Sequence, residues 1–127
     1  TEEVSEMERL VAAGDEASLI AALAIENDNV EAVTALALLL VERSGEGDRE
    51  AALQLLERIP ESAETRRIAA MARVEPVEDV ETTLGELLLA VKDDDEARQR
   101  FVDLLEVLGP DDPRTAEWRR RLTSTLF

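Results

Sequence analysis

The sequence contains no cysteine and no histidine. Their absence excludes thiol chemistry, disulfides, imidazole general bases and the commonest zinc sites. Paired carboxylates could still exchange protons, but nothing in the sequence indicates a carboxyl group with a raised pKa. We therefore expect a chain that is not an enzyme, with no catalytic residue, no cofactor and no bound metal.

Aromatic residues are scarce, with one tryptophan, two phenylalanines and no tyrosine. The core must therefore consist of Leu, Val, Ile and Ala. The four prolines and five glycines lie mostly between stretches of periodic apolar residues, which favours helices joined by short loops over sheets. No apolar run reaches the ~20 residues that a bilayer-spanning helix needs, and the start shows no signal-peptide pattern. We expect no membrane partner.

Positive charge is also in short supply, because 30 acidic residues outnumber 14 basic ones and the formal net charge is -16. Such a chain is repelled by phosphate backbones, so we expect no nucleic-acid partner. The run Asp93-Asp94-Asp95-Glu96 lacks the alternating ligands and central glycine of a calcium-binding loop. We expect Asp94 or Asp95 to cap the helix that follows.

Apolar periodicity predicts an all-α fold of about eight helices. The first seven are expected at 4–13, 16–27, 30–44, 48–59, 62–74, 78–92 and 95–108. Ser5 and Glu8 have the spacing of a capping box for the first of these. The helix at 30–44 is apolar nearly all round and should be the buried centre of the first half. Gly85 costs ~1 kcal/mol against alanine, and we expect it to allow close helix contact.

An internal repeat is indicated by Gly14-Asp15 and Gly47-Asp48, which lie 33 positions apart. This is close to the 34-residue period of tetratricopeptide repeats, in which a helical hairpin turns at Gly-Asp and stacks on the next hairpin. Ala52 has the small side chain expected at close helix approach, whereas Leu19 stands at the equivalent place in the first copy. We predict a tetratricopeptide-like helical hairpin array with degenerate repeats, and a generic hairpin array stays open.

The end of the chain predicts one more helix. Gly109 and Pro110 end the helix before it, while Asp112 can cap a helix that begins at Pro113. An apolar row of Trp118, Leu122 and Leu126 recurs every four residues, with Arg119, Arg120 and Arg121 on the flanks and opposite side. Such a helix either docks permanently on the core or binds a partner.

The same segment resembles one family. Its Leu108-Gly109, Asp111-Asp112-Pro113, Trp118-Arg119-Arg120, Leu122 and Leu126-Phe127 are similar to the end of the bacterial chaperedoxins, in which a thioredoxin-like domain precedes a tetratricopeptide domain. Family members often carry a further helix in the region of 73–81, where this chain is shorter. The resemblance implies one tetratricopeptide-like domain over 1–127, with atypical repeats at 61–127. This domain would be excised from a longer cytoplasmic protein with an upstream thioredoxin-like domain.

By this resemblance the domain holds unfolding client proteins and passes them to a chaperonin, while the upstream domain guards client thiols. The residues expected to bind partners are Trp118, Arg119, Arg120, Arg121, Leu122, Leu126 and Phe127. Of these, Trp118 and Leu122 should anchor the helix inward. The Leu126-Phe127 pair and at least one arginine should stay accessible.

Two other functions stay open. A generic tetratricopeptide scaffold would capture a short peptide with Lys, Arg and Asn on successive first helices of the hairpins. Those helices offer only Arg9 and Arg43. A purely structural dimerisation domain would instead show a concentration-dependent mass. We expect a monomer or a weak homodimer.

Overall fold

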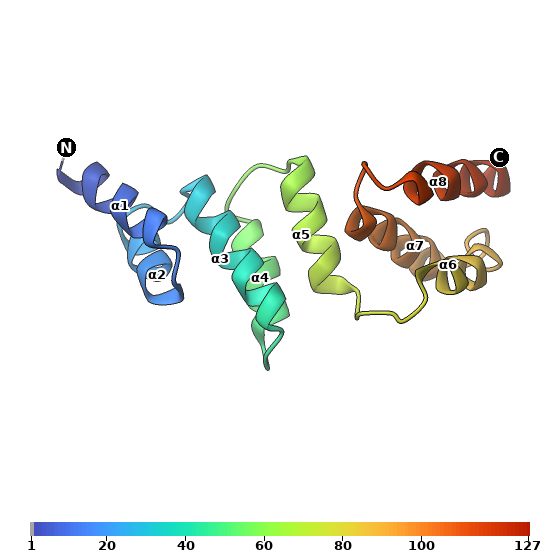
Figure 1. The fold of residues 1–127 in the computed structure, drawn as a ribbon, viewed down its shortest axis with the longest axis horizontal. Helices are drawn as coiled ribbons and strands as arrows, with labels where there is room; N and C mark the ends of the chain where they lie inside the picture. The colour runs from blue at the N-terminus through green and yellow to red at the C-terminus, as the bar shows by residue number, and fades with distance from the viewer. Residues whose placement is uncertain (1) are drawn as a thin grey trace. The chain divides into compact units, whose positions relative to one another are not determined.

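The computed structural model describes residues 2–127, apart from the side chains of Glu3 and Val4, and this part of the chain contains eight helices and no strand (Figure 1). The all-α prediction is therefore confirmed. The helices are α1 (Glu2–Ala13), α2 (Glu16–Ile25), α3 (Val30–Arg43), α4 (Asp48–Leu56), α5 (Ala63–Arg73), α6 (Val80–Leu88), α7 (Asp95–Leu108) and α8 (Pro113–Leu126). None of these helices has the length and hydropathy that a membrane crossing requires.

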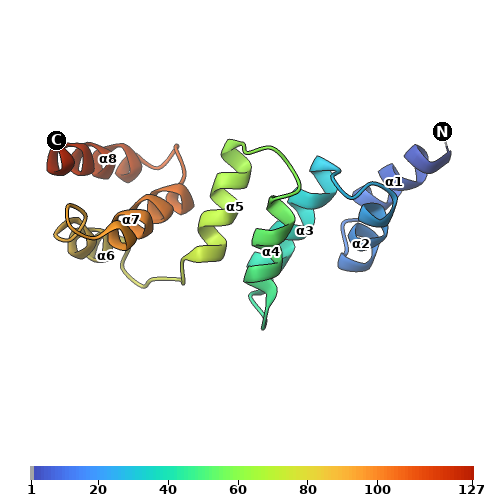
Figure 2. The ribbon, with the colours of Figure 1, turned by 180° about the vertical axis from the view of Figure 1, so that it is seen from behind.

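The chain divides into two compact units, Thr1–Ala72 and Arg73–Phe127. In the first unit, α1 packs on α2, α2 on α3 and α3 on α4. Figure 1 and Figure 2 both show α3 and α4 side by side. In the second unit, α7 packs against both α6 and α8. Each unit has its own hydrophobic core.

The core of the first unit is centred on α3, as predicted. Six α3 side chains are buried: Ala32, Val33, Leu36, Ala37, Leu40 and Val41. They pack with buried side chains of α2 and α4, including Leu19 and Ala52, neither of which is accessible to solvent. The two residues at the equivalent repeat position are therefore both core residues despite their different sizes.

The two Gly-Asp turns share backbone geometry but use their aspartates differently. Gly14 and Gly47 have φ angles of 74° and 77°, a left-handed conformation that glycine adopts without steric cost. The carboxylate of Asp15 caps α2 by accepting hydrogen bonds from the backbone N–H and hydroxyl of Ser18, at 3.1 and 2.6 Å. Asp48 instead is the first residue of α4. The two copies of the repeat therefore share the glycine conformation of the turn but differ in the hydrogen bonds that the aspartate makes.

Several helix ends differ from the sequence prediction by one to four residues, and three of these differences have a clear local cause. The first helix begins at Glu2, so Ser5 lies inside it and cannot be its N-cap. The sixth helix begins only at Val80, because the Asp79 carboxylate caps it by accepting from the Thr82 N–H at 3.2 Å. That helix also ends at Leu88, because the next N–H groups, of Leu89 and Ala90, bond to carbonyls three residues back and tighten the chain into turns.

The core of the second unit gathers the larger side chains. Its buried members are Leu84, Val91, Phe101, Leu104, Leu105, Trp118 and Leu122. Asp94 caps α7, since its carboxylate accepts from the backbone N–H groups of Glu96 and Ala97. The expected capping role within the acidic run is thereby confirmed. Asp95 forms an ion pair with Arg98. Among the side chains that the structure describes, no group of three or more acidic residues is arranged to hold a metal ion.

Candidate functional site

The start of α8 is fixed by local hydrogen bonds. Gly109 ends α7 with a φ of 86°, and its carbonyl accepts from the Thr115 hydroxyl at 2.6 Å. The Asp112 carboxylate caps α8 by accepting from the Arg114 backbone N–H at 2.9 Å and pairs with the Arg114 guanidinium at 2.8 Å. These contacts, first those of the guanidinium, lower the pKa of Asp112. The predicted cap at Asp112, with Pro113 as the first helical residue, is confirmed.

The inner face of α8 is anchored by Trp118 and Leu122, which are 7% and 9% exposed. The Trp118 indole meets the Phe101 ring edge to face, with 6.2 Å between ring centroids and 68° between planes. Such aromatic pairs add to the stabilisation from buried area. The expected inward anchor is therefore present.

Gly85 of α6 lies close to this anchor but is not required by it. A Cβ built at Gly85 would meet only the Cη2 atom of Trp118, at 3.8 Å, which is ordinary van der Waals contact. An alanine would therefore fit at this position, so the contact between α6 and α8 does not depend on glycine.

The three consecutive arginines of α8 have different surroundings. Arg121 is held in place, because its guanidinium carbon lies 4.4 Å from the centroid of the Trp118 ring and its Nη2 pairs with Glu117 at 2.8 Å. Arg119 and Arg120 are exposed, and among the described residues they form no ion pair. Two guanidinium groups of α8 therefore remain available to carboxylates from elsewhere.

The end of α8 is also accessible. Leu126 is half-buried against the core of the second unit, whereas Phe127 is 99% exposed. The seven residues predicted to bind partners thus divide into an anchor, a stacked arginine and an accessible set. A role in binding stays a prediction for all of them.

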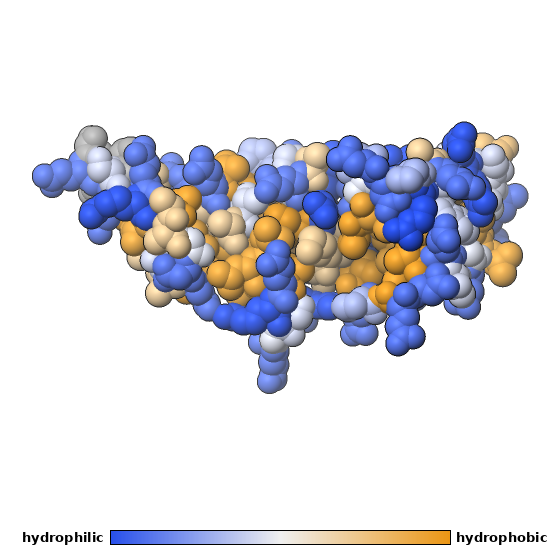
Figure 3. All heavy atoms as spheres, in the orientation of Figure 1, coloured by the Kyte–Doolittle hydropathy of each residue, from blue (hydrophilic) through white to orange (hydrophobic). Residues whose placement is uncertain are grey.

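A second candidate surface lies in the first unit, where α2, α3 and α4 border an open groove of about 360 Å³. Ile20, which is 53% exposed, forms one wall, and Leu36, Leu40, Ala51 and Leu55 supply further apolar lining. Figure 3 shows apolar atoms at the surface over α2 to α4, between hydrophilic side chains. Of its lining residues, only Arg43 was considered for binding from the sequence. Ile20 was missed, because the sequence pattern did not distinguish it from the buried side chains beside it.

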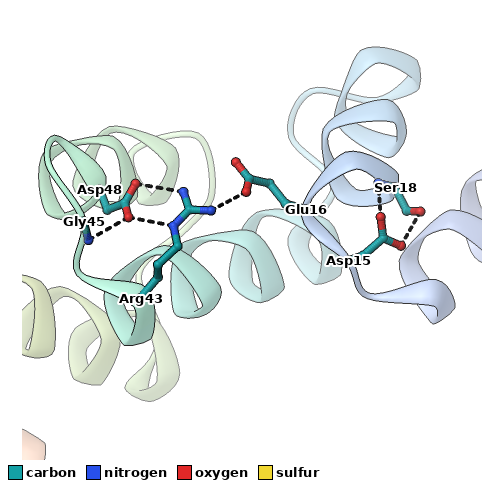
Figure 4. A network of polar contacts seen from close by, with 6 residues as sticks. All are labelled: Asp15, Glu16, Ser18, Arg43, Gly45 and Asp48. Carbon is teal, nitrogen blue, oxygen red and sulfur yellow. Dashed lines mark hydrogen bonds and ion pairs between the residues drawn. The ribbon is translucent and has the colours of Figure 1, made fainter.

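Three of the residues that line this groove, Glu16, Arg43 and Asp48, belong to a polar network (Figure 4). The Arg43 guanidinium donates to both carboxylate oxygens of Asp48, at 2.8 and 2.9 Å, and also pairs with Glu16. Asp48 further accepts from the Gly45 backbone N–H at 2.8 Å. Arg43 lowers the pKa of Asp48, while its own pKa is raised by the two carboxylates. Arg43 is therefore occupied and not free to clamp the carboxylate of a peptide.

The family is given by comparison with known sequences. The sequence pattern of the tetratricopeptide repeat family matches residues 10–127 and so extends across both compact units. No curated protein and no solved structure matches the chain. Tetratricopeptide arrays stack helical hairpins and use the resulting surfaces for protein–protein interaction, in agreement with the hairpins α1–α2 and α3–α4. The chain belongs to the tetratricopeptide repeat family and is a scaffold for protein–protein interaction.

Proposed function

We propose that this chain is the protein-binding domain of a thioredoxin-linked co-chaperone of the bacterial cytoplasm, which holds unfolding clients and passes them to a chaperonin. The observation that supports this most is the division of α8 into two parts. Trp118 and Leu122 fix the helix on the core, while Phe127, Arg119 and Arg120 face solvent. A helix built only for packing has no need of an exposed aromatic residue at its end.

The client site in this proposal is the groove of the first unit. Unfolding proteins expose apolar segments, and burial of such segments is favourable in proportion to the apolar area removed from water. Ile20 offers exposed apolar area at the groove wall, and Leu36, Leu40 and Leu55 lie deeper. The acidic exterior, with a net charge of -16, keeps copies of the domain apart while clients are bound.

The domain itself carries no chemistry in this proposal. It has neither cysteine nor histidine, so protection of client thiols would belong to a thioredoxin-like domain elsewhere in the protein. The tetratricopeptide part would provide recognition and transfer alone.

Removal of residues 123–127 tests the proposal. The truncation leaves Trp118 and Leu122 in place, so the melting temperature should change little, whereas binding to a purified chaperonin in a pull-down should be lost. Delay of aggregation of a thermally unfolding test protein should be retained, because the groove of the first unit is untouched. A 127-residue chain that neither binds chaperonin nor delays aggregation would refute the proposal. So would a truncated chain that binds chaperonin as well as the intact one.

A further inference from the structure

An open hollow of about 460 Å³ lies between the end of α6 and α8 in the second unit. Its lining consists of Leu88, Glu117, Arg120, Arg121, Ser124 and Thr125. Leu88 provides the apolar wall, and the next residue, Leu89, is 88% exposed. Neither leucine was singled out for binding from the sequence, although three consecutive leucines at 87–89 cannot all face one core.

The hollow carries a net positive charge on an acidic protein. Glu117 and Arg121 neutralise each other as an ion pair. Arg120 is exposed and forms no ion pair with the described residues, so its charge is unopposed. Phe127 follows Arg120 by seven positions, or two helical turns, and so lies on the same face of α8. The site therefore combines one free guanidinium with the exposed apolar side chains of Leu89 and Phe127.

We propose that this hollow, together with the exposed side chains of Leu89 and Phe127, docks an acidic and apolar segment of a partner protein. A carboxylate of the segment pairs with Arg120, whose planar guanidinium suits bidentate contact. Adjacent leucine-like side chains of the segment pack on Leu88 and Leu89. The inference rests on the proposed function, because it assigns partner chemistry to the accessible side of α8.

Charge decides between the possible occupants. Nucleic acids and anionic lipid surfaces carry the same sign as this chain, whose net charge is -16, and are repelled beyond the range of the local arginine. A second copy of the chain carries the same net charge and is repelled in the same way. A short acidic segment carries far fewer negative charges than these, so its long-range repulsion is weaker and is set against direct contact with Arg120.

The direct test uses a fluorescein-labelled helical peptide in which leucines recur every three or four residues with glutamates between them. Fluorescence anisotropy should show saturable binding to the 127-residue chain. Arg120→Glu should weaken binding by about fivefold or more, since it replaces an ion pair with repulsion. The matched control is Arg100→Glu, which changes the charge equally at another exposed arginine of the same unit that lies outside the hollow. It should leave the affinity within about twofold.

A second pair of variants tests the apolar part. Leu89→Ser should weaken peptide binding by roughly threefold or more, whereas Val30→Ser, at an exposed apolar residue of the first unit, should leave it unchanged. Both sites are exposed, so circular dichroism should show native helix content in all four variants.

Three results would overturn the inference. The first is an equal loss of affinity in Arg120→Glu and Arg100→Glu. The second is a loss of affinity in Arg120→Glu that is just as large for a peptide with lysines in place of the glutamates. The third is a concentration-dependent dimer that Arg120→Glu abolishes in sedimentation velocity, because a second copy would then be the occupant.

The proposed function can fail separately from the docking site. Peptide binding with the expected variant pattern but no chaperonin binding would refute the proposed function and leave the docking site intact. Chaperonin binding that is lost on truncation but unaffected by Arg120→Glu would refute the docking site alone.

Discussion

Arg121 lies over the indole ring of Trp118, with 4.4 Å between the guanidinium carbon and the ring centroid, and its other contact is an ion pair with Glu117 one helical turn earlier. The same ring also meets Phe101 edge to face. The arginine that the sequence placed among partner-binding residues thus shields the anchor of α8 from solvent.

Replacement of Arg121 by alanine should therefore lower the free energy of unfolding by about 1 kcal/mol, since an exposed cation–π contact and an exposed ion pair each contribute a few tenths to one. Arg121→Lys keeps the charge but loses the planar stack, so it should recover only part of this loss. Urea denaturation followed by Trp118 fluorescence measures both. Arg119→Ala is the control, and a loss as large as that of Arg121→Ala would contradict a special role for the stack.

The role of Trp118 as the anchor of α8 can be tested by comparing its replacement with that of Phe127, the last residue of the chain. Trp118→Ala should cost about 3 to 5 kcal/mol, because it empties a large site in the core of the second unit. Phe127→Ala should change stability by less than about 0.5 kcal/mol, because the side chain is 99% exposed. Denaturation followed by circular dichroism suits both variants. A large loss in Phe127→Ala would mean that Phe127 belongs to the core.

Gly85→Ala should stabilise the chain by about 0.5 to 1 kcal/mol. Alanine is favoured over glycine inside a helix, and its Cβ would meet Trp118 at an ordinary contact distance of 3.8 Å. Thermal denaturation should show a higher midpoint for the variant. A lower midpoint would indicate that the Trp118 ring lies too close to position 85 to accommodate a Cβ.

Local sequence signals were sufficient to predict most of the helices. Asp112, Pro113 and Gly109 act through their immediate neighbours, so the start of α8 could be predicted. The end of α6 could not, because Val91 continues the apolar periodicity even though the backbone has already turned after Leu88. The capping box at Ser5 failed for a similar reason, since its spacing also occurs inside helices.

The candidate sites were less predictable, because they depend on contacts between distant residues. Arg43 and Glu16 are 27 residues apart, and no sequence pattern marks their ion pair. The hollow beside Leu88 likewise depends on how α6 and α8 pack. By contrast, the inward position of Trp118 and Leu122 follows from helical periodicity, and the structure confirms it.

Acid should weaken the polar network of Glu16, Arg43 and Asp48. The pKa of Asp48 is lower in the folded chain than its ordinary value, first because of Arg43. The unfolded chain therefore takes up protons first, so this stabilisation is fully present above the unfolded pKa of ~3.9 and is lost as pH falls through the folded pKa. Asp15, Asp79 and Asp112 shift in the same direction.

The midpoint of urea denaturation should accordingly fall as pH is lowered from about 5 towards 2. Asp48→Asn should be less stable at neutral pH and should show a smaller fall, because the variant has one fewer carboxylate to protonate. A pH dependence identical to that of the unaltered chain would show that the pair between Arg43 and Asp48 contributes nothing measurable in solution.

The last prediction concerns Ile20 and the proposed client site. Ile20 is 53% exposed and lines the groove, while Ile25 of the same helix is 38% exposed and does not line it. Ile20→Ser and Ile25→Ser remove similar exposed apolar area from one helix, so each should change stability by less than about 1 kcal/mol. Only Ile20→Ser should shorten the delay that the chain imposes on aggregation of an unfolding test protein, as followed by light scattering.

If both variants shorten this delay equally, clients bind any apolar patch on α2. If neither does, client binding resides outside the groove, because loss of half-exposed area at its wall would otherwise weaken the contact.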